Sequence, residues 1–273
     1  MNGPPMKDWA IGVFDSGMGG LTVMRALAAR LPGESFVYLG DTARLPYGTK
    51  SGDTVTRYAV QAAGTLVKRR IKLLVVACNT ASGVALPTLR EAFAPLPVID
   101  VIAPGAKAAL AASPSGPIAV IATEGTVKAG AYMHAIHARA PQVEVMSQAC
   151  PLFVPLAEEG LIEGEIVDLV IHRYLDGLLA RKPHSLVLGC THYPALKSSI
   201  AKIAGPDVVL VDSAATTAFA VETRLRADEM LREGGPAPHR FLATDATERF
   251  ARVGEIFLGA RIAPASVELV DLQ

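Results

Sequence analysis

The sequence is poor in cysteine, in aromatic residues and in charge. Three cysteines in 273 residues are too few for a disulfide framework, and their odd number is typical of proteins in a reducing compartment. Charged residues make up 19 %, below the roughly 25 % of an average soluble chain, which argues against disorder. Because 26 basic residues balance 26 acidic ones, no overall charge attracts the chain to nucleic acid or to an anionic membrane.

Long apolar runs are missing as well. Residues 1–10 lack the unbroken apolar stretch of a signal peptide, and no later segment offers about eighteen consecutive uncharged apolar residues. We therefore expect a soluble cytoplasmic protein that binds neither nucleic acid nor membrane. The apolar content of 51 % and the length predict one or two domains with packed cores.

What the sequence does contain is one pattern written twice. Short apolar runs, each followed by a small or polar cluster and then by helix-compatible residues, are typical of parallel strands that lead into crossover helices. Equivalent run ends in the two halves lie about 110 residues apart: Asp15 and Thr123, Asp41 and Cys150, Cys78 and Cys190, Pro104 and Ala214. We expect strands at 10–14, 35–39, 72–77, 98–102, 117–121, 143–147, 185–188 and 208–211.

The repeat predicts an α/β fold with two pseudo-symmetric domains, each a mainly parallel sheet flanked by helices. The active site is expected in the cleft between them. A strand at 240–243, a helix from Asp245 to about Leu258 and a final strand at 267–272 have no counterpart in the repeat. We expect this tail to return to the first domain. The predicted division is 1–98 with 208–273 for the first domain and 99–207 for the second.

Polar residues gather where the predicted strands end, and in open α/β sheets this is where ligands bind. The first strand ends at Asp15-Ser16, the third at Cys78-Asn79-Thr80 and the seventh at Cys190-Thr191-His192. Because Cys78 and Cys190 are equivalent in the repeat, a cleft between the halves would place one thiol on each side of a bound substrate.

Two thiols that flank a small substrate fit the inversion of a stereocentre. One removes a proton from carbon as a thiolate, and the other delivers a proton to the opposite face. A free thiol titrates at about 8.5, so the base needs a nearby carboxylate or imidazole. Asp15 is placed to assist Cys78, and His192 to assist Cys190. Hydroxyl, amide and backbone N–H donors for a substrate carboxylate follow the same strands, at Ser16, Asn79, Thr80 and Thr191.

Five ordered segments carry a resemblance to a known family. They are GVFDSGMGGLTV (12–23), GDTARLPYGTKS (40–51), ACNTAS (77–82), CPLFVPLAEEG (150–160) and LGCTHYP (188–194). These segments closely resemble glutamate racemases, of the aspartate/glutamate racemase superfamily, over essentially the whole chain. The resemblance implies an isomerase independent of pyridoxal phosphate, with no cofactor and no metal. It would interconvert L- and D-glutamate, supply D-glutamate for peptidoglycan and act as a homodimer.

The resemblance also implies roles for individual residues. Cys78 would deprotonate the D-enantiomer and Cys190 the L-enantiomer. Asp15 and His192 would be the auxiliary groups beside them, and Asp41 and Glu158 the supporting acids. The expected substrate contacts are Asp15, Ser16, Pro46, Tyr47, Gly48, Asn79, Thr80, Thr191 and His192. Aspartate racemases usually carry an acidic residue at the position of His192, so this histidine favours glutamate.

Several alternatives stay open at this point. Asp15 could serve only as a helix cap and Asp41 only to order a turn, and the sequence does not separate Glu158 from Glu159. Cys150 reads as a buried core residue. A zinc site made by the other two cysteines and His192 lacks the usual ligand spacing and a fourth ligand. A racemase for aspartate or another small acid would keep the chemistry and change the substrate. A two-domain binding protein with structural cysteines is a third alternative, and the reducing-compartment composition and the paired thiols count against it.

Overall fold

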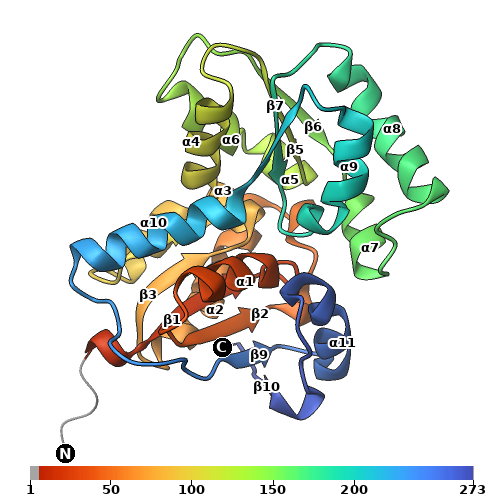
Figure 1. Ribbon diagram of the computed structural model, residues 1–273. Helices are drawn as coiled ribbons and strands as arrows, with labels where there is room; N and C mark the ends of the chain where they lie inside the picture. The colour runs from red at the N-terminus through yellow and green to blue at the C-terminus, as the bar shows by residue number, and fades with distance from the viewer. Residues whose placement is uncertain (1–5, 273) are drawn as a thin grey trace, which may run out of the picture.

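The computed structural model describes residues 6–272 and contains two sheets in which every strand pairing is parallel. One sheet is built from β1 (Ala10–Asp15), β2 (Phe36–Gly40), β3 (Ile71–Val76), β4 (Val98–Asp100), β9 (Arg240–Ala243) and β10 (Val267–Leu269). The other is built from β5 (Ile118–Ala122), β6 (Val145–Ala149), β7 (Ser185–Gly189) and β8 (Val209–Asp212). Helices flank both sheets (Figure 1).

The helices alternate with the strands, as crossover connections require. They are α1 (Leu21–Arg30), α2 (Gly52–Val67), α3 (Asn79–Ala92), α4 (Ile102–Ala112), α5 (Glu124–Lys128), α6 (Ala131–His137), α7 (Phe153–Glu158), α8 (Glu165–Leu179), α9 (Lys197–Ala204), α10 (Ser213–Ala227) and α11 (Thr247–Leu258). Short 3-10 turns occur at Met6–Asp8, Thr42–Arg44, Tyr47–Thr49, Tyr193–Leu196 and Pro264–Ser266. Within residues 6–272, no helix is long and apolar enough to cross a membrane.

The order of the strands confirms the predicted α/β fold and its repeat. The first sheet has the order β10-β9-β2-β1-β3-β4 and the second the order β6-β5-β7-β8, so β1 to β4 match β5 to β8 one to one. All eight repeat strands lie within about two residues of the predicted bounds. Because the order reverses direction at β1 and at β5, the carboxyl ends beside these two strands are the expected ligand-binding points.

The tail returns to the first sheet, as predicted. β9 pairs with β2, and β10 pairs with β9. The predicted second boundary differs from the strand pairing, because β8 pairs with β7 in the second sheet although it was assigned to the first domain. The division into domains stays a prediction, and this pairing favours a boundary after Asp212.

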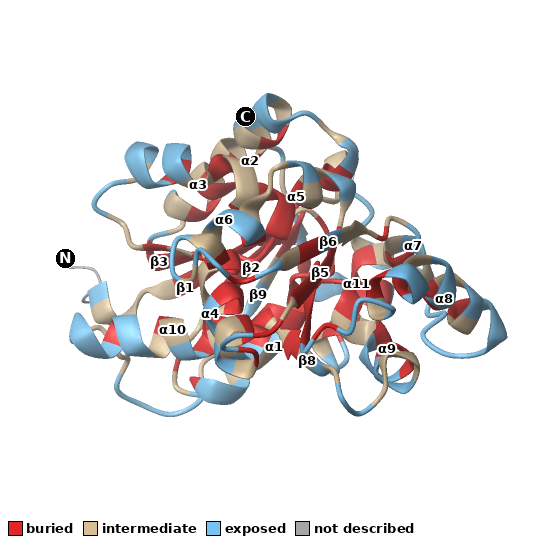
Figure 2. Cartoon of the chain, turned by 90° about the horizontal axis from the view of Figure 1, so that it is seen from above, coloured by how far each residue is buried: buried red, intermediate tan, exposed pale blue. Residues whose placement is uncertain are grey.

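The central strands are buried along almost their whole length, which explains why most of their residues are apolar. β1 and β3 in the first sheet and β5 and β7 in the second have helices on both faces, and every residue of β3, β5 and β7 is buried. Figure 2 shows buried residues concentrated along the strands in the middle of the molecule. Helix starts follow local capping rules. The Ser51 hydroxyl accepts a hydrogen bond from the Thr54 N–H at the start of α2, and the Asp212 carboxylate accepts one from the Ala214 N–H at the start of α10.

Candidate active site

Both predicted catalytic thiols line one small cavity at the carboxyl ends of the strands. Its volume is about 30 Å³, which holds roughly two water molecules. Every predicted substrate contact except Asp15 lies in the wall of this cavity. Of the two predicted supporting acids, Glu158 lines the cavity and Asp41 does not. The lining residues are Ser16, Gly17, Leu45, Pro46, Tyr47, Gly48, Cys78, Asn79, Thr80, Thr123, Val154, Glu158, Cys190, Thr191 and His192.

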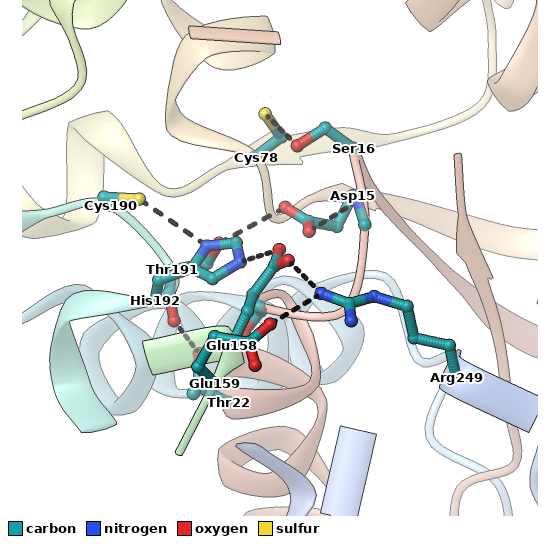
Figure 3. A network of polar contacts seen from close by, with 12 residues as sticks. Asp15, Ser16, Thr22, Cys78, Glu158, Glu159, Cys190, Thr191, His192 and Arg249 are labelled. Carbon is teal, nitrogen blue, oxygen red and sulfur yellow. Dashed lines mark hydrogen bonds and ion pairs between the residues drawn. The ribbon is translucent and has the colours of Figure 1, made fainter. Parts of the chain in front are cut away.

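Cys78 follows β3 and caps the start of α3. Its Sγ accepts a hydrogen bond from the Ala81 N–H at 3.5 Å and donates to the Ser16 Oγ at 3.6 Å (Figure 3). Burial, and next the negative charge of Asp15, raises the pKa of Cys78 to about 12. The thiol therefore keeps its proton at neutral pH.

Asp15 is fully buried behind the cavity wall at the end of β1. Its Oδ2 accepts a hydrogen bond from the Gly17 N–H at 3.0 Å, and its Oδ1 accepts one from the Thr191 hydroxyl at 3.4 Å. Burial raises the pKa of Asp15, and the charge of His192 opposes this rise. Asp15 thus orders the turn into α1, which matches the helix-cap alternative. It also links that turn to the loop that carries Cys190.

On the other side of the cavity, Cys190 begins a chain of polar contacts (Figure 3). Its Sγ lies 3.8 Å from the Nδ1 of His192, and the Nε2 of His192 lies 3.1 Å from the Oε1 of Glu158. Burial alone lowers the pKa of His192, but hydrogen bonds with Cys190 and Glu158 outweigh it and raise that pKa to about 10. The imidazole is therefore protonated at neutral pH.

The structure separates Glu158 from Glu159. Glu158 is the partner of His192, whereas the side chain of Glu159 is 65 % exposed. Burial acts to raise the pKa of Glu158, but hydrogen bonds from His192 and Arg249 lower it overall, so the group is a carboxylate at neutral pH. The Glu158 side chain therefore carries the charge that holds the imidazolium in place.

Arg249 extends this series of polar contacts, and the sequence did not indicate its role. It lies on α11 in the tail, and its Nη2 donates to the Oε2 of Glu158 at 3.1 Å. Since α11 belongs to the tail that extends the first sheet and α7 follows a strand of the second, the ion pair joins the two halves. No local pattern marks Arg249, because its partner lies 91 residues away.

Asp41 lies outside the cavity and organises one of its loops. Its Oδ2 accepts hydrogen bonds from the Arg44 Nε at 2.7 Å and from the Tyr47 hydroxyl, and its Oδ1 accepts one from the Thr244 hydroxyl at 2.9 Å. These contacts match the turn-ordering alternative, since they hold Tyr47 in the wall. A catalytic role for Asp41 stays a prediction.

Two glycines of the GMGG segment let the chain pass close to the site. A Cβ on Gly19 would lie 2.5 Å from the Nδ1 of His192, and a Cβ on Gly20 would lie 2.5 Å from the Cβ of Asp15. Both separations are far below van der Waals contact, so any larger residue would displace a polar group of the site. The segment therefore serves close packing around the site.

Asn79 and Thr80, at the start of α3, face the cavity with hydrogen-bonding groups. The Nδ2 of Asn79 is buried and has no hydrogen-bond partner among the described residues. The Thr80 hydroxyl lies 3.0 Å from the hydroxyl of Thr123. Thr123 was not predicted as a site residue, although the repeat pairs it with Asp15 and so contained the signal.

Cys150 lies in the core, as expected. Its thiol donates to the Gln148 carbonyl at 3.7 Å, and it packs in the apolar cluster of the second sheet with Phe153 and Leu186. Cys150 does not line the cavity. Across residues 6–272, no group of three or more His, Cys, Asp or Glu side chains is arranged to hold a metal ion.

Comparisons with known proteins show the family of the chain. The family model of Asp/Glu/hydantoin racemases matches residues 11–221. A glutamate racemase of Geobacter metallireducens is 51 % identical over 254 residues, which cover 93 % of this chain and 94 % of that protein. The Bacillus anthracis glutamate racemase isoform has a TM-score of 0.93 at 39 % identity, covering 97 % of this chain and 98 % of the other.

A solved relative also holds a ligand. The glutamate racemase of Francisella tularensis, crystallised in complex with D-glutamate, has a TM-score of 0.91 and 40 % identity, covering 97 % of this chain and 98 % of the other. Identity at this level over nearly the full length of both chains shows more than a shared architecture. The chain therefore belongs to the Asp/Glu/hydantoin racemase family and is an amino-acid racemase, an isomerase.

Proposed function

We propose that this enzyme interconverts L-glutamate and D-glutamate by a two-base mechanism in which Cys78 and Cys190 carry the protons. The observation that carries the proposal is the placement of the two thiols. They follow equivalent strands of the repeat, β3 and β7, and both line one cavity, each with its own polar partner. Relatives named glutamate racemases supply the substrate class.

The proton transfers take place between the two thiols and the substrate. With L-glutamate, the Cys190 thiolate takes the Cα proton, and the electron pair left on Cα is delocalised into the α-carboxylate. The Cys78 thiol then donates its proton to the opposite face of Cα, which gives D-glutamate. Cys190 ends as a thiol and Cys78 as a thiolate, and the D-enantiomer reacts by the same steps in reverse.

The protonation states of the two sides suit the reaction that begins from L-glutamate. Cys78 keeps its proton, because burial and Asp15 raise its pKa to about 12, so it is ready to act as the acid. His192 is positively charged beside Cys190, because its pKa is raised to about 10. A protonated imidazole next to sulfur stabilises a thiolate, which is the form that the base requires.

Neutral donors supply the binding groups for the substrate carboxylates. The unpartnered Nδ2 of Asn79 is such a donor, and removing it from water without a partner costs free energy that a substrate oxygen would recover. The start of α3, which Asn79 and Thr80 form, adds the partial positive charge of a helix N-terminus. Because the cavity of about 30 Å³ is too small for an amino acid, we expect its walls to separate when substrate enters.

The cellular role follows from the product. D-glutamate made by this enzyme would supply peptidoglycan synthesis. The cytoplasm suits the mechanism, because both thiols must stay reduced to exchange protons. The homodimer implied by the family resemblance stays a prediction.

Racemisation in heavy water tests the proposal directly. The purified enzyme is incubated with saturating L-glutamate and no pyridoxal phosphate, and optical rotation and deuterium at Cα are followed together. We expect rotation to fall to zero while deuterium enters at Cα. Unchanged rotation would reject the proposal, and racemisation of L-aspartate in place of L-glutamate would reject the substrate while keeping the chemistry.

A further inference from the structure

Tyr132 touches the neighbours of both thiols without lining the cavity. It lies on α6, is 2 % exposed, and donates a hydrogen bond from its hydroxyl to the Oδ1 of Asn79 at 2.8 Å. Asn79 directly follows Cys78. On the other side of its ring, the Cε2 atom lies 3.0 Å from the position that a Cβ on Gly189 would take, and Gly189 directly precedes Cys190.

This hydrogen bond sets which end of the Asn79 amide faces the cavity. Burial raises the pKa of Tyr132, so the hydroxyl keeps its proton. It donates to the Oδ1 of Asn79, so the NH₂ group is the end of the amide left for the cavity that Asn79 lines. The Nδ2 is the buried amide atom that has no partner among the described residues.

Two glycines leave room for the ring. A Cβ on Gly105 of α4 would lie 3.1 Å from the Cε1 of Tyr132, and one on Gly189 would lie 3.0 Å from its Cε2. Such separations are tighter than ordinary van der Waals contact, so any larger residue at either position would press on the ring, which is itself buried. The position of the hydroxyl is therefore set by packing.

We propose that Tyr132 is a positioning residue that aims the Asn79 N–H groups at a carboxylate of the bound substrate and holds the loops of the two thiols in register. The inference rests on the proposed function, since it deepens how that site binds glutamate. Tyr132 acts through Asn79 and does not touch the reacting atoms.

The test is Tyr132→Phe, which removes the hydroxyl and keeps the ring. We expect KM for both glutamate enantiomers to rise about five- to tenfold, the usual effect of one lost hydrogen bond, while kcat changes less than about twofold. The matched control is Tyr174→Phe on α8, whose hydroxyl accepts a hydrogen bond from the Leu152 N–H at 3.4 Å, and this variant should match the wild type. An unchanged KM in folded Tyr132→Phe would overturn the inference.

Combining variants separates positioning from a general structural effect. If Tyr132 acts through Asn79, then Tyr132→Phe should change KM by less than about twofold in an Asn79→Ala background. An undiminished effect in that background would overturn the inference. Gly105→Ala is a second way to displace Tyr132, because its Cβ would press on the tyrosine ring from α4. This variant should also raise KM for glutamate.

The outcomes keep the two proposals apart. A wild-type enzyme that leaves glutamate optically unchanged rejects the proposed function. A wild-type enzyme that racemises glutamate, together with an unchanged KM in folded Tyr132→Phe, rejects the role of Tyr132 and leaves the proposed function standing.

Discussion

The Nδ1 of His192 lies 3.8 Å from the Sγ of Cys190, two residues earlier on the loop after β7. The other ring nitrogen contacts Glu158, which pairs with Arg249 on α11. A chain of charges therefore runs from one thiol to a helix of the opposite half of the molecule. Any change in how the two halves pack would therefore alter the charges next to the Cys190 thiol.

Removing either cavity thiol should abolish racemisation. Cys78→Ala and Cys190→Ala each delete one proton carrier, so we expect the rate to fall by about 10²- to 10⁴-fold or more. Cys150→Ala is the control, because Cys150 is buried outside the cavity. Rates are measured by circular dichroism on folded variants, and activity retained in either of the first two would contradict the two-base mechanism.

His192→Asn should impair the step at Cys190 selectively. The two enantiomers have equal free energies, so kcat/KM must stay equal in the two directions and the asymmetry must appear elsewhere. We expect a larger primary isotope effect with Cα-deuterated L-glutamate, because abstraction by Cys190 becomes rate-limiting. The isotope effect with Cα-deuterated D-glutamate should fall toward one. Equal isotope effects for the two substrates would remove the assigned role of His192.

Arg249→Gln should weaken catalysis moderately. The Arg249 side chain is 41 % exposed, so its ion pair with Glu158 is screened, and we expect kcat to fall about two- to fivefold. Arg249→Lys should recover part of the loss. Arg252→Gln, at an exposed position on the same helix, is the matched control. If the Arg249 and Arg252 variants behave alike, the ion pair has no role in the reaction.

Gly19→Ala should damage the site and leave the fold intact. Its Cβ would meet the Nδ1 of His192 at 2.5 Å and force the imidazole away from Cys190. We expect activity to fall at least about tenfold, since catalytic groups tolerate little displacement. Gly177→Ala in α8 is the control, because its added Cβ would meet nothing within 4 Å apart from the backbone of its own helix. Alanine should also stabilise the helix by about 1 kcal/mol. Full activity in Gly19→Ala would contradict the proposed packing.

The His192–Glu158 pair should make stability depend on pH. The pKa of His192 is about 10 in the folded chain against an ordinary value of 6.5, so folding favours its protonated form. This stabilisation is complete below about pH 6.5 and is lost as the pH rises through about 10. The Tm of Glu158→Gln should therefore lie at least about 2 °C below the wild type at pH 7, and the difference should shrink above pH 10. A difference that does not depend on pH would argue against a charged imidazole.

Apolar periodicity was sufficient to predict the strands, the repeat and the two equivalent thiols, because these patterns depend on residues close together in the chain. The return of the tail to the first sheet was predicted from the absence of a counterpart for β9, α11 and β10. The predicted boundary before β8 stays a prediction, and the pairing of β8 with β7 favours a later one. A strand next to a crossover between sheets has the same local pattern in either sheet.

The identities of Cys78 and Cys190 as candidate proton carriers, and the α/β class itself, follow from the order of residues alone. The choice of Glu158 over Glu159, the ion pair with Arg249 and the contact of Tyr132 with Asn79 needed the folded chain. Each joins residues 34 or more positions apart, namely 34, 91 and 53. The contact of Glu158 with His192 arises from packing within the second half, and the other two arise from the packing of one half against the other. No local periodicity encodes which side chains meet over such separations in the sequence.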